Sequence, residues 1–255
     1  WLQNAGFIWV PFIAFSALAS WFGMNDLAGA KASFGEQAVI FTRKHNWLMC
    51  WLYLGTFGSF IGFSAGLPML IQSQFQGVDA LHYVWLGPLL GALLRPLGGW
   101  LADHVGGARV TFWTFVVMTL GVAAVLACLP RQGQGGHFAG FMISFAVLFA
   151  ASGIGNGSNF RMIPSIFLAE RQQAAGPLPS EQRQAATDAN KEAAAVLGFA
   201  SALGAYGGFF IPKSYGASIA LTGSPEAALQ AFVLFYLSCI AVTWWHYSRR
   251  NAPMP

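Results

Sequence analysis

Long apolar segments, each about as long as a bilayer is thick, dominate this sequence and leave it few possible folds. A helix needs about 20 mostly apolar residues to cross about 30 Å of hydrocarbon. Charged residues make up only 9% of the chain, whereas a soluble domain has about 25%. The segments also lack the alternation of β-barrel strands, so the sequence predicts an all-α integral membrane protein. Seven spans are expected, at roughly 2–22, 47–71, 81–102, 110–129, 139–162, 193–212 and 228–248.

The basic residues around these segments predict their orientation, because lysine and arginine accumulate in cytoplasmic loops. One side would hold only two of them, Arg131 and Lys213. The other side would hold ten: Lys31, Arg43, Lys44, Arg109, Arg161, Arg171, Arg183, Lys191, Arg249 and Arg250. We therefore expect the second side and the C-terminus to be cytoplasmic, and Trp1 to lie outside.

Residues 165–192 differ from the apolar segments around them and contain the polar run GPLPSEQRQAATDANKEAAA. Proline breaks a helix that continues from the preceding segment, and serine is a residue type that caps the start of a helix. The run predicts a cytoplasmic connector, with a new helix capped by Ser180 that continues into the sixth segment. A role in gating or in binding a partner is the alternative.

Arg95 lies inside the third segment, in the run GALLRPLGGWLAD. A cation at that depth costs about 2.5–3.5 kcal/mol on insertion scales. The segment cores contain no acidic residue, and Asp103, which follows eight residues later, has Arg109 as a competing partner. An anion that binds and leaves would offset the cost, and a planar guanidinium suits a planar oxyanion. A snorkelling or structurally paired arginine remains the alternative.

Other residue types in the segments fit such a site. Tyr53 and Phe57 are four residues apart and share one face of the second segment. They offer a hydroxyl and an aromatic ring, although aromatics at this spacing often serve packing alone. Small residues allow helices to approach closely or to bend. Glycine is dense in three segments, in the runs YLGTFGSFIGFSAG, GIGNGSNF and GFASALGAYGGFFIP.

The turn after the third segment reads GGWLADHVGGARV. Gly106 and Gly107 predict a tight reversal, which leaves Asp103 and Arg109 close enough to pair. The run resembles the G-x-x-x-D-x-x-G-x-R loop of the major facilitator superfamily. The resemblance implies a cytoplasmic latch that holds helices together in one state of a transport cycle. His104 stands where that family often has a basic residue, which weakens the expected charge network.

Nearly the whole chain resembles the nitrate/nitrite porter family, which is NarK-like and belongs to this superfamily. Five runs carry the resemblance: FGMNDLAGAKAS, WLYLGTFGSFIGFSAGLPML, LLRPLGGWLAD, SGIGNGSNF and GFASALGAYGGFFIPKSYG. The resemblance implies that residues 1–22 are the sixth of twelve spans and 23–46 the central cytoplasmic loop. Residues 47–248 would then be the C-terminal six-helix bundle and 249–255 a cytoplasmic tail. An N-terminal half, with a second arginine and the first nitrate signature, would be missing from this sequence.

The resemblance also implies roles for single residues. Arg95 matches the family's substrate-binding arginine, and Tyr53 and Phe57 match the residues that hydrogen-bond and stack on the anion. The glycine-rich sixth segment matches the second nitrate signature, where Ser201 is a weaker candidate for contact with the anion. Conformational roles fall to Gly198, Gly204, Gly207 and Gly208, with Gly55 and Gly58 on the second segment. Arg161 is expected to snorkel to the cytoplasmic surface.

These observations predict a transporter of a bacterial inner membrane that exchanges nitrate for nitrite by alternating access. Nitrate, nitrite, lipid and the other transporter half are the expected partners, with no nucleic acid, cofactor, metal or enzymatic activity. Proton symport is the competing mechanism, because the other half could supply a titratable group. Another major facilitator porter, or a non-transporting scaffold, also remains open. A retinal sensor is disfavoured because residues 228–248 contain no lysine.

Overall fold

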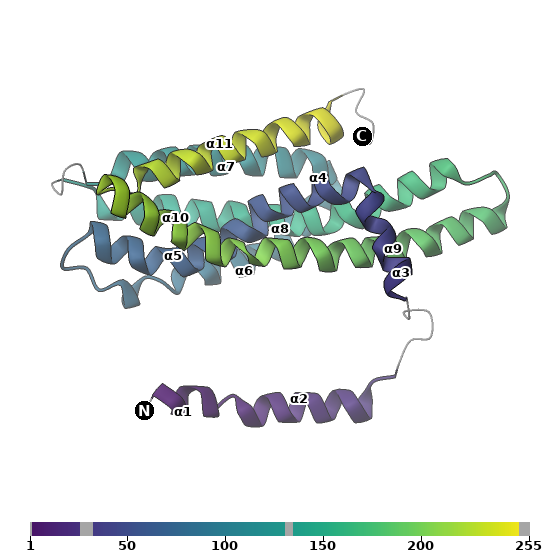
Figure 1. Cartoon of the computed structure of the whole chain (residues 1–255), viewed down its shortest axis with the longest axis horizontal. Helices are drawn as coiled ribbons and strands as arrows, with labels where there is room; N and C mark the ends of the chain where they lie inside the picture. Colours follow the sequence, from purple (N-terminus) through teal and green to yellow (C-terminus); the bar gives the residue numbers. More distant parts are fainter. Residues whose placement is uncertain (1, 26–32, 131–134, 250–255) are drawn as a thin grey trace. The chain divides into compact units, whose positions relative to one another are not determined.

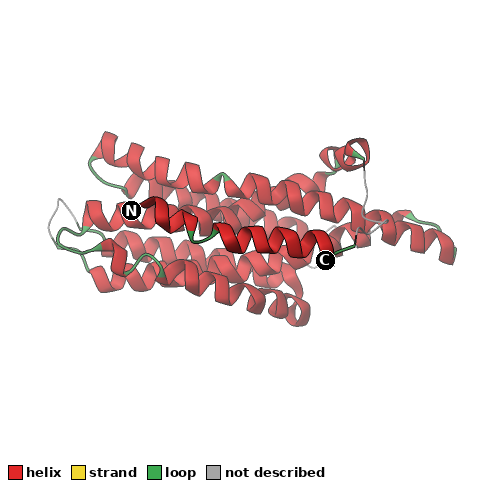
Figure 2. Ribbon diagram, turned by 90° about the horizontal axis from the view of Figure 1, so that it is seen from below, coloured by secondary structure: helices red, strands yellow, loops and turns green. Residues whose placement is uncertain are grey.

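A computed structural model describes residues 2–25, 33–130 and 135–249. Helices account for nearly all of these residues (Figure 2). The chain divides into two compact units, residues 1–36 and 37–255. The positions Trp1, Lys31, Arg131 and Arg250, which the orientation prediction uses, lie outside the described residues.

The first unit contains two apolar helices, α1 (Leu2–Phe7) and α2 (Val10–Gly23). The sequence predicted one continuous span over 2–22, and this prediction is wrong in detail. Pro11 has no N–H to donate to the carbonyl of Phe7, four residues earlier, so the helix is interrupted near that point. α2 is apolar but shorter than a helix that would cross a bilayer by itself.

In the second unit, all six segments predicted between 47 and 248 are helical (Figure 1). Five continuous helical stretches have the length and apolar composition needed to cross a membrane. One of them, Ala80–Cys128, contains two predicted spans, which meet at Gly106 with φ of +99°. The boundary between the two units falls within the short helix α3 (Phe34–Ala38). The later elements are a 3-10 helix (Val39–Thr42), α4 (Lys44–Tyr53), a π-helical segment (Leu54–Gly58), α5 (Ser59–Gln74), a 3-10 helix (Ala80–His82), α6 (Leu86–Leu101), a second π-helical segment (Ala102–Gly106), α7 (Gly107–Cys128), α8 (Phe138–Ala174), α9 (Pro179–Ala205), α10 (Gly207–Thr222), α11 (Glu226–Thr243) and a third π-helical segment (Trp244–Ser248).

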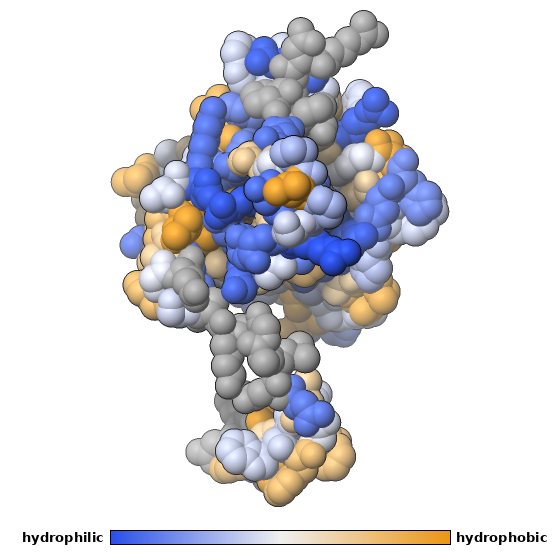
Figure 3. Space-filling view, turned by 90° about the vertical axis from the view of Figure 1, so that its right-hand side faces the viewer, coloured by the Kyte–Doolittle hydropathy of each residue, from blue (hydrophilic) through white to orange (hydrophobic). Residues whose placement is uncertain are grey.

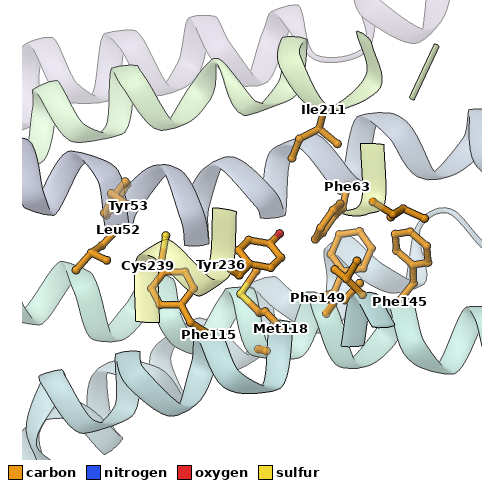
Figure 4. Packing of buried hydrophobic residues seen from close by; sticks show 14 of the residues in the cluster. Leu52, Tyr53, Phe63, Phe115, Met118, Phe145, Phe149, Ile211, Tyr236 and Cys239 are labelled. Atoms are coloured by element: carbon orange, nitrogen blue, oxygen red, sulfur yellow. The ribbon is translucent and has the colours of Figure 1, made fainter. Parts of the chain in front are cut away.

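α8 is the central helix of this unit, and it packs against α6, α7 and α9. α5 packs against α10, and α11 packs against α7. Aromatic side chains fill the space between the helices, as Figure 4 shows for Phe63, Phe115, Phe149 and Tyr236. These four side chains are fully buried and belong to the hydrophobic core of the bundle.

Residues 165–192 form a helical hairpin, because α8 continues to Ala174 and α9 starts at Pro179. The predicted interruption at the Gly-Pro and Pro positions is confirmed, but Ser180 does not cap α9. Leu178 takes the capping position and Pro179 the first turn, where its missing N–H costs little. Arg43 and Arg171 both bond Glu192, which is 6% exposed, so the hairpin is tied to the start of α4. Hydrophilic residues dominate the view of this end of the second unit (Figure 3).

Lys213 lies inside α10, nine residues before its last residue Thr222, and not in the outer loop that the sequence predicted. The predicted segment ended at Pro212, but this proline falls within the helix. Transmembrane helices tolerate an internal proline where neighbouring groups satisfy the freed carbonyl. The side that was predicted to hold only Arg131 and Lys213 therefore has one loop cation fewer than the sequence indicated.

Candidate functional site

Arg95 projects from α6 and lies between two aromatic rings. Its guanidinium carbon is 5.9 Å from the centroid of Phe57 and 5.8 Å from the centroid of Phe160. Both distances are within the range of cation–π attraction. The side chain is partly buried and forms no ion pair with a described residue. The Arg95 guanidinium thus lies near two aromatic rings, and no acid among the described residues pairs with it.

A seam of glycines brings Arg95 to this position. A Cβ on Gly157 of α8 would overlap the carbonyl oxygen of Arg95, and a Cβ on Gly153 would overlap the backbone of Gly91. On the α6 side, Gly98 touches the backbone of Ile154 in the same way. The α6 and α8 backbones are therefore in direct contact, which carries the Arg95 side chain up to Phe160 on α8.

Tyr53 and Phe57 approach the site from the other side. Their ring centroids are 5.4 Å apart, and Tyr53 is 1% exposed. A Cβ on Gly204 of α9 would lie 2.8 Å from a ring carbon of Phe57 and 3.3 Å from one of Tyr53. The structure therefore brings three of the predicted site residues together in the order Arg95, Phe57 and Tyr53. Ser201 lies one turn before Gly204 on α9 and is partly buried.

The predicted conformational glycines have different surroundings. A Cβ on Gly207 would overlap the backbone of Gly58, and one on Gly208 would lie 2.8 Å from a methyl carbon of Ile61. Gly55 faces a ring carbon of Phe115 at 2.7 Å. Gly198, in contrast, has no atom within 4 Å of the Cβ position. Close approach of helices therefore explains most of these glycines, but not Gly198.

A buried polar network beside the site was missed by sequence reasoning. The Nδ2 of Asn159 donates to the Leu52 carbonyl at 3.2 Å and to the Thr56 hydroxyl at 3.0 Å. Its Oδ1 accepts from Thr111 at 2.9 Å. The network joins α8, α7 and the end of α4 next to Phe57. The sequence signal for this network was the polar residues of the run GNGSNF, which was interpreted only by its glycines.

At the turn between α6 and α7, Asp103 pairs with Arg161 and forms no ion pair with Arg109. Both carboxylate oxygens accept from Arg161, each at 2.8 Å. The predicted reversal at Gly106 and Gly107 is confirmed. Asp103 lies in the π-helical segment before the reversal and contacts Arg161 of α8, whereas Arg109 lies in the first turn of α7. Arg161, expected to snorkel freely, thus joins α8 to this turn.

The second unit is a bundle of long apolar helices that can cross a membrane. No family model matches the chain. It is 49% identical to the nitrate/nitrite transporter NarU of Salmonella typhimurium, over 98% of the chain and 54% of that protein. NarU of Escherichia coli is 45% identical, over 98% of the chain and 54% of its own length. The "Probable nitrate/nitrite antiporter NarK2" of Thermus thermophilus is 35% identical, over the whole chain and 53% of that protein.

The chain belongs to the nitrate/nitrite porter family of the major facilitator superfamily. It spans about half the length of the curated relatives it matches. The chain therefore belongs to a family of transporters and not of enzymes.

Proposed function

We propose that this chain forms the C-terminal bundle of a nitrate/nitrite transporter, and that Arg95 binds the anion. The observation that carries the proposal is a partly buried guanidinium flanked by Phe57 and Phe160, with no acid of the described residues to neutralise it. An intramembrane ionisable group of this kind marks a substrate pathway. The relatives with nitrate or nitrite in their names support the proposed substrate class.

In this proposal the anion lies against the Arg95 guanidinium, which offers paired N–H donors to a planar oxyanion. The Phe57 ring presents a flat surface to the ligand, and the Tyr53 hydroxyl is the neighbouring donor. Phe160 covers the other side of the guanidinium and limits its contact with water. Ser201 approaches from α9 as a further polar contact.

A second bundle completes the site, since transporters of this superfamily bind substrate near the midplane between two repeats. Closing two bundles over an empty site would bury an uncompensated charge, which costs several kcal/mol. A bound anion removes that cost. The bundles therefore interconvert readily only when loaded, which produces exchange of one anion for another.

The two-bundle transporter in proteoliposomes tests the exchange. We expect nitrate uptake when the vesicles contain nitrite, and little uptake when they contain no exchangeable anion. A pH gradient alone should not drive uptake into such vesicles. Labelled nitrate entry measures both conditions, with protein-free vesicles as the control. Uptake driven by the pH gradient into empty vesicles would establish symport instead, and absence of nitrate transport in every condition would remove the proposed substrate.

We further propose that Asp103 and Arg161 are the cytoplasmic latch. Asp103→Asn and Arg161→Gln should each change the exchange rate several-fold, and the double variant should resemble the single variants, because the two residues act through one interaction. Because both side chains are exposed, protein stability should hardly change. Exchange rates at saturating nitrate measure the effect.

Arg109→Gln is the matched control for this latch. Its effect should add independently to that of Asp103→Asn, because Arg161 holds both carboxylate oxygens. Non-additivity between Asp103 and Arg109, with additivity between Asp103 and Arg161, would restore the pairing that the sequence predicted.

A further inference from the structure

One buried amide next to the Arg95 site has an unused hydrogen-bonding atom. Asn156 is 2% exposed, and its Oδ1 is buried without a partner. Asn159, three residues later on α8, uses both ends of its amide in the polar network. An unsatisfied buried polar atom is costly, and native structures rarely retain one without a reason. The two asparagines therefore have different roles.

The position of Asn156 on α8 directs it toward the Arg95 site. Residues four apart share a face of a helix, and Phe160, four residues after Asn156, packs on the Arg95 guanidinium. Phe149, seven residues before, contacts Phe60 of α5 with ring centroids 6.1 Å apart. This spacing puts Asn156 on the same face of α8 as Phe149 and Phe160. The adjacent residue Gly157 touches the Arg95 backbone.

We propose that Asn156 is a further anion-binding residue of this transporter, an inference that rests on the proposed function of Arg95. Nitrate and nitrite oxygens accept hydrogen bonds but donate none. The anion therefore bonds the Nδ2 end of the amide, which donates. The Oδ1 end needs a donor, and the guanidinium of Arg95 has five N–H groups. The amide thus links the cation to the anion and orients both.

The chemistry of this link sets a preference among ligands. An amide that donates to one anion oxygen while the guanidinium donates to others suits a small oxyanion with several oxygens in one plane. A halide is a single spherical acceptor, so it cannot present separate oxygens to the amide and to the guanidinium. We therefore expect chloride to compete poorly with nitrate, and this discrimination to depend on Asn156.

Asn156→Ala in the complete two-bundle transporter is the test. Nitrate affinity should fall about tenfold, as expected for the loss of one hydrogen bond to a charged group, and chloride should compete better. The unfolding temperature without anion should stay unchanged or rise, because an unsatisfied buried atom is removed. Asn156→Asp keeps the shape but replaces the donor by a carboxylate oxygen, so it should abolish nitrate binding.

Asn159→Ala is the matched control, because it breaks three hydrogen bonds of the network. It should lower the unfolding temperature clearly and leave the affinity of the folded fraction near that of the wild type. Equal destabilisation by Asn156→Ala and Asn159→Ala would overturn the inference, as would unchanged nitrate affinity in Asn156→Ala. If the wild type itself shows no nitrate binding, the proposed function fails, and this inference fails with it. If the wild type binds nitrate and Asn156→Ala binds it equally well, this inference alone fails.

Discussion

Replacing Arg95 with lysine is expected to lower nitrate affinity by about 10- to 100-fold, although the positive charge is kept. Lysine has a compact ammonium and loses the rigid fork that meets two oxygens of a planar anion. It would also lose the planar face that lies beside Phe57 and Phe160. Nitrate-dependent thermal stabilisation and exchange rates in proteoliposomes measure the change.

Arg183→Lys is the control for the Arg95 substitution. Arg183 is exposed on α9, in the hairpin, and the same change of side chain there should leave exchange unaffected. If Arg95→Lys also exchanges at the wild-type rate, the site needs only a charge. The assignment of Arg95 as a geometric ligand would then be wrong, and a structural role for the arginine, which the sequence left open, would become the better explanation.

Most of the helical architecture was predictable because a long apolar segment is stable in a bilayer only as a helix that satisfies its own backbone hydrogen bonds. Each of the six segments between 47 and 248 is helical, and the reversal at Gly106 occurs where two glycines permit it. The predicted helix boundaries were wrong near two prolines. Pro212 lies within α10, where the membrane environment tolerates it, whereas Pro11 coincides with the interruption that the sequence did not predict.

The candidate site was predictable in its residue types but not in its partners. Arg95 could be singled out because a charge in an apolar segment is costly. Tyr53 and Phe57 could be singled out because they share one helix face and match residues of the family that the sequence resembles. Phe160 could not, because its proximity to Arg95 depends on how closely α6 and α8 approach at Gly157. The same limit explains the pairing of Asp103. Arg109 is closer in sequence, but Arg161 is closer in space.

Gly207→Ala should destabilise the bundle by about 1–3 kcal/mol or more, although alanine is the better helix former. The added Cβ would overlap the backbone of Gly58, and backbone cannot move aside as a flexible side chain does. α5 and α10 would have to separate, which also disturbs Gly62, whose Cβ position is 2.6 Å from the Gly207 carbonyl. Thermal unfolding in detergent measures the loss.

Gly198→Ala is the control for Gly207→Ala, since both glycines lie in the glycine-rich run GFASALGAYGGFFIP. The Cβ position of Gly198 is open, so alanine should be neutral or stabilise the helix by up to about 1 kcal/mol. A stable Gly198→Ala variant with slow exchange would mean that this glycine faces the second bundle or bends during transport. Equal destabilisation by both substitutions would contradict the packing explanation, because only Gly207 has backbone against it. The two glycines of this run therefore differ in function: Gly207 lets α10 pack against α5, and Gly198 leaves space on α9.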